Sequence, residues 1–317
     1  MILTRTPYRI SLSGGGTDLP KFFNKKFCYG SIISFSINKY IYISVNYLAE
    51  KKIILKYSKT EVIFDVKNIK HKLIKKVLQF FKIKHGVEIH SIGEFSGHGT
   101  GLGSSSAFLI GLINAISNFK NIKLSKKQIY EIAIKIELSI YPNVGIQDHL
   151  ACTFGSFNYW KIQTNKISRV KINNKKILKN INNIFIVNTH IKRSANTIIK
   201  NYKFNLAMRE KLKKSAYDTD QLYKNLRRKE IYLPKAINNS WILKKKLNSK
   251  VTTVKIEKII KLGIESGAMA SKLLGAGGGG FILFYVKNSL RKIFEKKMIK
   301  FKPIKVNIDH YGTKRLI

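Results

Sequence analysis

The stretch that decides how this 317-residue chain is interpreted is Gly97-His98-Gly99-Thr100-Gly101-Leu102-Gly103-Ser104-Ser105-Ser106-Ala107. Its four glycines lead directly into an apolar segment, residues 104–118, which has helical spacing. Glycine lets a backbone approach a ligand closely, and the free N–H groups at the start of a helix attract an anion. The spacing therefore predicts that the loop from Gly97 to Ser106 binds phosphate groups. The alternative is a flexible loop followed by a serine-capped helix.

This loop differs from two common nucleotide-binding motifs. It lacks the Lys-Ser/Thr ending of GxxxxGK[ST], and Leu102 stands where GxGxxG needs its last glycine. Gly275, Gly277 and Gly280 do fit GxGxxG further along the chain. There we expect a helix before the glycines and a strand after them, which is not the strand, loop, helix order of a dinucleotide site. We therefore expect this cluster to pack closely on a neighbouring loop or ligand.

Another glycine cluster, Gly14-Gly15-Gly16-Thr17-Asp18, lies near the start of the chain. It follows a predicted strand and ends just ahead of Pro20. The glycines permit positive φ angles, and the Asp18 carboxylate supplies acceptors that suit sugar hydroxyls. The alternative is a tight turn followed by a helix N-cap.

Carboxylates are scarce in this chain, which makes the positions of two of them informative. Glu137 falls in a predicted helix that begins with a capping box, Ser125 and Gln128, and Asp148 follows eleven residues later. Near a phosphate loop, such a pair can hold Mg²⁺ and orient or deprotonate a hydroxyl. The alternatives are a helix ion pair for Glu137 and an N-cap role for Asp148.

The remaining patterns predict an α+β protein with two domains, residues 1–182 and 183–317. Residues 165–183 are interpreted as a β-turn-β excursion that leads to the domain boundary. Strands are predicted where β-branched and aromatic residues gather, and helices where apolar residues recur at helical spacing. The strands are 31–37, 41–48, 52–57, 61–66, 86–93, 184–188 and 281–286, and the helical patterns are 69–84, 104–118 and about 194–267.

The charge balance is strongly basic, with 60 Lys+Arg, 17 Asp+Glu and a net charge of +43. Such a charge often indicates a nucleic acid or an anionic membrane as partner. Here the lysines are spread along the whole chain together with many Ile and Asn, which argues against a dedicated nucleic-acid surface. A positive field would equally attract a phosphorylated small substrate.

Cysteine and hydropathy patterns point to a cytoplasmic protein. Cys28 and Cys152 are far apart and form no CxxC pair, so neither a disulfide framework nor a zinc site is expected. The chain begins without the pattern of a secretory signal and has no apolar run long enough to cross a membrane. Its seven histidines show no metal-ligand spacing, and GxSxG is absent.

In this order, the three glycine clusters resemble those of the GHMP kinase superfamily, over residues 5 to about 287. Within it, the chain most resembles D-glycero-D-manno-heptose 7-phosphate kinases. Each motif alone would be unspecific, but together they are specific. The stretches that carry the resemblance are Arg5–Pro20, Val144–Asn158, Lys192–Ala195 and Leu273–Gly280. The chain departs from the family pattern at Ser96-Gly97-His98 and at Ser156.

The resemblance implies transfer of the γ-phosphoryl group of ATP to a sugar hydroxyl. The loop of residues 97–107 would hold the nucleotide, with Ser105 and Glu137 as Mg²⁺ ligands. Asp148 would lie beside the acceptor hydroxyl, and Arg9 would be the cation near the transferred phosphoryl group. The implied fold has a ribosomal protein S5 domain 2-like N-terminal domain and a ferredoxin-like C-terminal domain, with the site between them.

The resemblance also implies an acceptor that already carries a phosphate. The residues expected to bind this substrate are Gly15, Gly16, Thr17, Asp18, Arg193, Gly277 and Gly278. Among them Arg193 is the predicted phosphate ligand, because a guanidinium pairs with two phosphate oxygens at once. The alternatives are a GHMP kinase for an unphosphorylated fucose- or galactose-type sugar, and a non-catalytic basic protein that binds nucleic acid.

Overall fold

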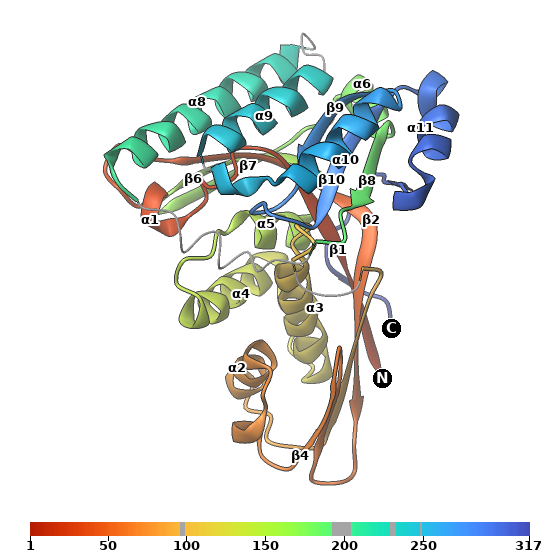
Figure 1. The fold of residues 1–317 in the computed structure, drawn as a ribbon. Coiled ribbons are helices and arrows are strands. Elements are labelled where there is room, and N and C mark those ends of the chain that lie inside the picture. Colours follow the sequence, from red (N-terminus) through yellow and green to blue (C-terminus); the bar gives the residue numbers. More distant parts are fainter. Residues whose placement is uncertain (96–98, 192–203, 229–232, 248) are drawn as a thin grey trace.

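The computed structural model spans residues 1–317 and describes all of them except 96–98, 192–203, 229–232 and 248. The predicted functional residues Gly97 and Arg193 lie outside the described residues. In the described part, two β-sheets are packed with helices (Figure 1). This arrangement confirms the predicted α+β class.

The larger sheet has eight strands and begins at the N-terminus. Its main path is β12-β1-β2-β5-β3-β4, and β6 and β7 branch from β2. All its pairs are antiparallel except β3 with β5. The strands are β1 (Ile2–Ser13), β2 (Gly30–Tyr47), β3 (Ile53–Lys56), β4 (Thr60–Ile63), β5 (Val87–Gly93), β6 (Phe157–Gln163), β7 (Lys166–Lys171) and β12 (Lys314–Arg315).

One long strand, β2, replaces the two strands predicted at 31–37 and 41–48. The polar residues between them stay extended because β1 pairs along nearly the whole length of β2. On its other edge β2 changes partner, with residues 30–35 on β6 and residues 41–47 on β5. The register between β1 and β2 shifts between Pro7 and Arg9, which is a bulge next to a predicted functional residue.

The apolar helix predicted at 104–118 is α3 (Ser104–Phe119), and every residue from Ser106 to Ser117 is buried. It packs on β1 and β2. Gly111 permits this approach, because a Cβ there would lie 2.9 Å from Oγ1 of Thr6. The helices around α3 are α2 (Lys72–Phe80), α4 (Lys126–Ile140) and α5 (Gln147–Phe154). The start of α3 is therefore held by packing on several sides.

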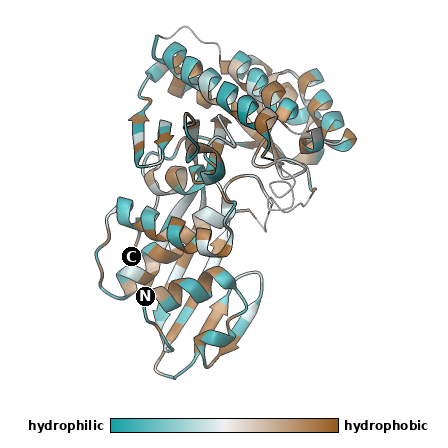
Figure 2. Ribbon diagram, turned by 90° about the vertical axis from the view of Figure 1, so that its left-hand side faces the viewer, coloured by the Kyte–Doolittle hydropathy of each residue, from teal (hydrophilic) through white to brown (hydrophobic). Residues whose placement is uncertain are grey.

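The smaller sheet is entirely antiparallel and has the order β11-β8-β10-β9. Two long helices, α8 and α9, pack together beside it (Figure 1). Figure 2 shows helices that alternate between hydrophilic and hydrophobic residues, as expected when one face of a helix lies in a core. The strands are β8 (Ile184–Asn188), β9 (Ala268–Leu273), β10 (Phe281–Val286) and β11 (Ile304–Lys305).

Shorter and outlying helical segments complete the described chain. The α-helices not yet given are α1 (Pro20–Phe23), α6 (Lys175–Ile181), α8 (Leu206–Arg228), α9 (Leu233–Leu247), α10 (Val254–Glu265) and α11 (Arg291–Lys297). The 3-10 segments are η1 (Val66–Asn68), η2 (Ser249–Val251), η3 (Asn288–Leu290) and η4 (Ile299–Phe301).

Two further local predictions were wrong. The segment 165–183 is not strand on both sides of a turn, because β7 is followed by the helix α6, which buries Ile177 and Ile181 at helical spacing. The segment before Gly275 is not a helix but the strand β9, which pairs with β10. Residues 268–273 are almost all buried, and alternation of polar and apolar residues is weak in a strand covered on both faces.

The predicted domain boundary, between residues 182 and 183, falls between α6 and β8, where the chain passes from one sheet to the other. The end of the chain returns to the first sheet. Ile308 bridges to Ile37, and β12 pairs with β1. The two-domain division itself stays a prediction.

Candidate active site

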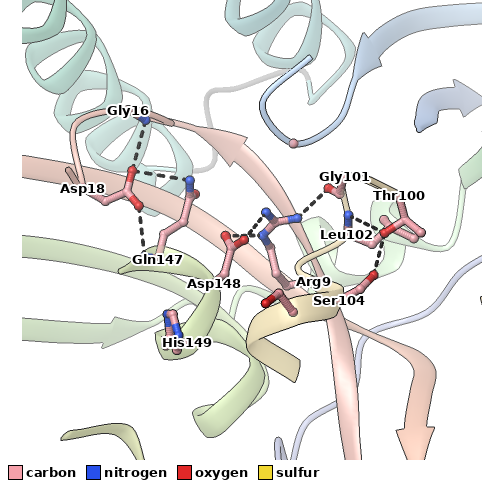
Figure 3. A network of polar contacts seen from close by, with 12 residues as sticks. Arg9, Gly16, Asp18, Thr100, Gly101, Leu102, Ser104, Gln147, Asp148 and His149 are labelled. Atoms are coloured by element: carbon pink, nitrogen blue, oxygen red, sulfur yellow. Dashed lines mark hydrogen bonds and ion pairs between the residues drawn. The ribbon is translucent and has the colours of Figure 1, made fainter. Parts of the chain in front are cut away.

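Arg9 and Asp148 form the centre of the candidate site. Arg9 lies on β1 and is 3% exposed, and Asp148 is in the first turn of α5. The guanidinium donates from Nε to Oδ1 at 2.7 Å and from Nη2 to Oδ2 at 2.6 Å, a bidentate ion pair (Figure 3). Its remaining nitrogen, Nη1, donates to the carbonyl of Gly101 at 2.6 Å. The predicted cation and the predicted carboxylate are thus in direct contact beside the glycine loop.

The loop before α3 has the geometry of an anion site. Gly99, Gly101 and Gly103 all have φ between 76° and 83°, a left-handed conformation that favours glycine. Gly103 is the N-cap of α3, and no side chain of a described residue caps the first amides of the helix. These N–H groups, with the helix dipole behind them, are therefore available to phosphate oxygens. The alternative was a helix capped by a serine side chain, but the N-cap residue is Gly103, which has no side chain.

Side chains within the loop bind one another. Oγ1 of Thr100 lies 2.6 Å from Oγ of Ser104 and accepts from the amide of Leu102 at 3.2 Å. Leu102 is fully buried, and its carbonyl accepts from the amide of Arg9 at 2.9 Å. The loop is thereby tied to β1 through backbone as well as side-chain hydrogen bonds.

The third glycine cluster packs against this loop, as the sequence predicted. A Cβ on Gly275 would lie 2.4 Å from Cα of Gly101, and one on Gly280 would lie 2.4 Å from the carbonyl oxygen of Thr100. The amide of Phe281 also donates to that oxygen at 2.9 Å. The glycines are required here because two backbones meet with no room for a side chain between them.

Gly277 and Gly278, the predicted substrate residues of this cluster, face η2 instead. A Cβ on Gly277 would lie 2.7 Å from Cβ of Val251, and the amide of Gly278 donates to the Val251 carbonyl at 2.7 Å. Their contact with substrate stays a prediction.

Glu137 and Ser105, the predicted metal ligands, are neighbours. Oγ of Ser105 donates to Oε1 of Glu137 at 3.2 Å, and Glu137 is 3% exposed. The other carboxylate oxygen of Glu137 contacts Nε2 of His149. Burial raises the pKa of the Glu137 carboxyl, but His149 and the Ser105 hydroxyl together lower it more, so the net shift is downward. A negatively charged carboxylate beside a hydroxyl suits a hard cation such as Mg²⁺.

These two side chains cannot form a complete metal site by themselves. Among the described residues, no three His, Cys, Asp or Glu side chains gather as metal ligands would. Mg²⁺ characteristically takes one or two protein oxygens and completes its shell with water and substrate phosphates. Ser105 and Glu137 fit that pattern.

His149 is a buried residue of this site that the sequence analysis did not single out. Its side chain is fully buried between α5 and α4, next in sequence to Asp148. Consecutive residues on a helix point about 100° apart, so Asp148 faces Arg9 while His149 faces Glu137. The proximity of Asp148 in sequence was the only available signal.

Asp18 connects the first glycine cluster to α5. Its Oδ2 accepts from the amide of Gln147 at 3.1 Å and its Oδ1 from the amide of Gly16 at 3.0 Å (Figure 3). The side chain is 2% exposed, and a Cβ on Gly145 would lie 2.1 Å from Oδ2. Burial raises the pKa of Asp18 to about 6, the charge of Asp148 raises it further, and the backbone hydrogen bonds lower it. The carboxylate supports the start of the helix that carries Asp148.

The rest of that cluster is held by Thr17. Its hydroxyl donates to the carbonyl of Gly14 at 2.7 Å and accepts from the amide of Ser31 at 3.0 Å. Thr17 is fully buried, whereas Gly15 is exposed. A Cβ added to Gly15 would lie 3.8 Å from the Gln147 side chain. Contact of Gly15, Gly16, Thr17 and Asp18 with a sugar stays a prediction.

A glycine-rich helix start, an arginine–carboxylate pair beside it and a nearby serine–glutamate pair define a phosphoryl-transfer enzyme. Residues 69–156 match the family model of the GHMP kinases N terminal domain. The chain is 30% identical over 310 residues to D-glycero-alpha-D-manno-heptose 7-phosphate kinase of Campylobacter jejuni, covering 90% of this chain and 89% of that protein. The chain therefore belongs to the GHMP kinase family and is a kinase.

Solved structures agree with this family. A putative sugar kinase of Campylobacter jejuni superposes with a TM-score of 0.79 at 25% identity, covering 99% of this chain and 97% of that one. A D-glycero-D-manno-heptose 1-phosphate kinase of Bacteroides thetaiotaomicron gives a TM-score of 0.78 at 20% identity, covering 100% and 99%. They confirm the predicted GHMP kinase fold. No described helix is long and apolar enough to span a membrane.

Proposed function

We propose that this kinase uses ATP to phosphorylate D-glycero-D-manno-heptose 7-phosphate to the 1,7-bisphosphate, a step toward nucleotide-activated heptose. The observation that carries the proposal is the 30% identity, over 90% of this chain, to a kinase of that substrate class. The contact between Arg9 and Asp148 beside the phosphate loop supports the chemistry.

Asp148 is the proposed base and Arg9 the proposed electrostatic partner. The Asp148 side chain is 25% exposed and the Arg9 side chain only 4%, so an acceptor hydroxyl can reach the carboxylate but not the guanidinium. The hydroxyl gives its proton to Asp148 while its oxygen bonds to the γ-phosphorus, and the bond from that phosphorus to the β-phosphate oxygen breaks to leave ADP. Arg9 holds the carboxylate in place and supplies a fixed positive charge.

The nucleotide is assigned to the loop of residues 97–106 and the first turn of α3. The uncapped amides of α3 and the positive φ angles of its glycines support this assignment. Ser105 and Glu137 would hold Mg²⁺, which when bound neutralises charge on the phosphate oxygens. Both side chains supply oxygen, and the downward pKa shift of Glu137 favours its charged form.

For the acceptor we keep the residues predicted from sequence. Gly15, Gly16, Thr17 and Asp18 would contact sugar hydroxyls, and Arg193 would bind the phosphate that the acceptor already carries. Arg193 lies outside the described residues, so this part of the proposal is supported by the sequence alone. A cytoplasmic setting belongs to the same proposal, because it supplies ATP and keeps Cys28 and Cys152 as free thiols.

The experiment is a steady-state kinase assay with three acceptors: heptose 7-phosphate, heptose 1-phosphate and unphosphorylated heptose, each with ATP and Mg²⁺. We expect the highest kcat/KM with the 7-phosphate and a product phosphorylated at carbon 1 by phosphorus NMR. A preference for the neutral sugar would contradict the sugar-phosphate assignment and favour the fucose- or galactose-type alternative. In Arg193→Ala we expect kcat/KM to fall about 10- to 150-fold with the 7-phosphate only.

A further inference from the structure

Lys272 is a buried lysine that has no acidic partner among the residues that the structure describes. It lies on β9 and is 5% exposed. Its Nζ donates to the carbonyls of Ser11 and Leu12 at 3.1 and 2.8 Å and to the hydroxyl of Ser240 at 2.7 Å. All three N–H donors of the ammonium are therefore used on neutral oxygens. These bonds join the smaller sheet to the end of β1 and to α9.

Lys244 on α9 makes similar contacts, with the carbonyls of residues that closely follow Lys272 in the chain. Its Nζ donates to the carbonyl of Leu273 at 2.8 Å and to that of Gly275 at 2.5 Å. Among the described residues, no carboxylate lies within ion-pairing distance of Lys244 or Lys272. Both ammonium groups thus bind backbone carbonyls where an ion pair would be expected.

The two lysines meet around the glycine loops of the candidate site. Gly275, whose carbonyl Lys244 binds, packs on Gly101 of the phosphate loop. The Ser11 and Leu12 carbonyls, which Lys272 binds, lie on β1 just beyond Arg9 and just before the first glycine cluster. Lys244 therefore fixes backbone that contacts the loop proposed to bind nucleotide, and Lys272 fixes the strand that carries Arg9.

The charges of these groups act on one another. Burial and then the positive charge of Arg9 lower the pKa of Lys272 to about 7. Burial, followed by the charges of Lys272 and Arg9, lowers the pKa of Lys244 well below its usual range. Within the described part of the chain, the carboxylate that binds this group of Arg9, Lys244 and Lys272 is Asp148, through Arg9. A bound polyanion would supply the missing negative charge.

Burying an ammonium without a carboxylate costs free energy that an apolar side chain of similar size would avoid. We propose that Lys244 and Lys272 are positioning residues of the nucleotide site, which hold the Gly275–Gly280 loop and the end of β1 against the phosphate loop and favour binding of the nucleotide's phosphates. This inference rests on the proposed binding of ATP at that loop. It adds two residues that act through the loops without touching the reacting atoms.

The test compares Lys244→Met and Lys272→Met with a matched control, Lys245→Met. Lys245 is the next residue on α9, and its side chain is 39% exposed, lies over the Trp241 ring and faces Glu257. ATP binding is measured by titration calorimetry without acceptor, and KM for the acceptor is measured separately. We expect ATP to bind about 3- to 30-fold more weakly to both variants. Lys245→Met should match the wild type in ATP affinity and in KM for the acceptor.

The outcomes separate the inference from the proposed function. If the wild type does not bind ATP, the proposed function fails. If the wild type binds ATP and both methionine variants bind it equally well, the positioning role is wrong. A lower thermal stability of the variants would not by itself support that role. If Lys244→Met misfolds, Lys244→Arg replaces it in the test, because the arginine guanidinium can still donate to the Leu273 and Gly275 carbonyls. Lys244→Arg should bind ATP more tightly than Lys244→Met.

A second measurement is the uptake of protons when ATP binds, which a purely structural role of Lys272 would not change. A bound polyphosphate raises the pKa of Lys272, whose charged neighbours are Arg9 on β1, Lys244 on α9 and Asp148 on α5 through Arg9. ATP binding at about pH 8 should therefore take up protons, because that pH lies above the pKa of about 7. Calorimetry in two buffers of different ionisation enthalpy should show more uptake by the wild type than by Lys272→Met. Equal uptake would overturn the proposal.

Discussion

The guanidinium of Arg9 and the carboxylate of Asp148 form a bidentate ion pair across 139 residues of sequence. The pair lies at the meeting point of β1, α5 and the phosphate loop, because the same guanidinium also binds the carbonyl of Gly101. A cation and a base that hold each other in position have little freedom to reorganise during the reaction. Their contact is the main structural argument for phosphoryl transfer at this site.

Removing the base should stop turnover without preventing nucleotide binding. In Asp148→Asn, we expect kcat to fall about 10²- to 10⁴-fold, since an amide cannot accept the proton of the acceptor hydroxyl. ATP affinity, measured by calorimetry, should stay within a small factor of wild type. Turnover close to wild type would remove Asp148 from the mechanism.

The geometry of the pair can be tested through Arg9→Lys. A lysine keeps the positive charge but has a single ammonium, which cannot bind both oxygens of Asp148 and the carbonyl of Gly101 in the same planar arrangement. We expect kcat to fall by at least about tenfold while KM for ATP changes less. Steady-state kinetics at saturating acceptor are the measurement, and equal changes in both parameters would indicate a binding role instead.

Glu137→Gln should change the response of the enzyme to Mg²⁺. We expect the Mg²⁺ concentration for half-maximal activity to rise, because an amide oxygen is a weaker ligand for a hard cation than a carboxylate. Ser105→Ala should show the same change in milder form. The control is Glu131→Gln on the same helix, where the residue is exposed and its carboxylate faces Lys127. Superimposable Mg²⁺ titrations for Glu137→Gln and wild type would show that Glu137 only supports α4.

Glu137→Gln also tests the contact with His149. Both side chains are buried, so the variant leaves the His149 ring without its carboxylate partner. We expect the free energy of unfolding to fall by about 1–3 kcal/mol, the usual cost of leaving a buried hydrogen-bonding group without its partner. Chemical denaturation gives this value independently of the Mg²⁺ titration, so the two roles of Glu137 can be separated.

Asp18 should make the stability of the fold depend on pH in the acidic range. Its pKa is about 6 in the folded protein, above the value of about 3.9 for an unfolded chain. Its stabilising contribution is therefore fully present below about pH 4 and is lost as the pH rises through about 6. Asparagine does not ionise, so Asp18→Asn should not lose this contribution. As the pH rises from 4.5 to 7.5, the free energy of unfolding of the variant should therefore increase relative to wild type by about 1–3 kcal/mol. Urea denaturation at several pH values measures this difference, and parallel curves would contradict it.

The contact between the glycine loops predicts a strong effect of Gly101→Ala. Gly101 has φ of +76°, and a Cβ there would lie 2.7 Å from the carbonyl oxygen of Leu274. We expect a loss of more than about 2 kcal/mol of stability and weaker ATP binding, from the left-handed backbone and the steric conflict together. The control is Gly15→Ala, where the nearest atoms lie 3.8 Å away, and which should leave stability almost unchanged. Equal melting temperatures for the two variants would contradict the packing argument.

Much of the local structure could be predicted because local physics determines it. The capping box of Ser125 and Gln128 forms as predicted, since its partners are three residues apart. The glycine turn at Gly103 and the helix α3 follow from glycines next to an apolar helical pattern. The prediction failed at β9, which is covered on both sides, because buried strands and helices have similar composition.

The sequence by itself determined the class of this protein: an α+β GHMP kinase with three glycine clusters and a few well-placed carboxylates. Only the tertiary structure decided which groups bind one another. It placed Asp148 on Arg9, Glu137 on His149, and the Gly275 loop on Gly101. It also surrounded Lys272 with three neutral oxygens. These contacts join elements far apart in the chain, and their strength depends on burial, which no local pattern of residues specifies.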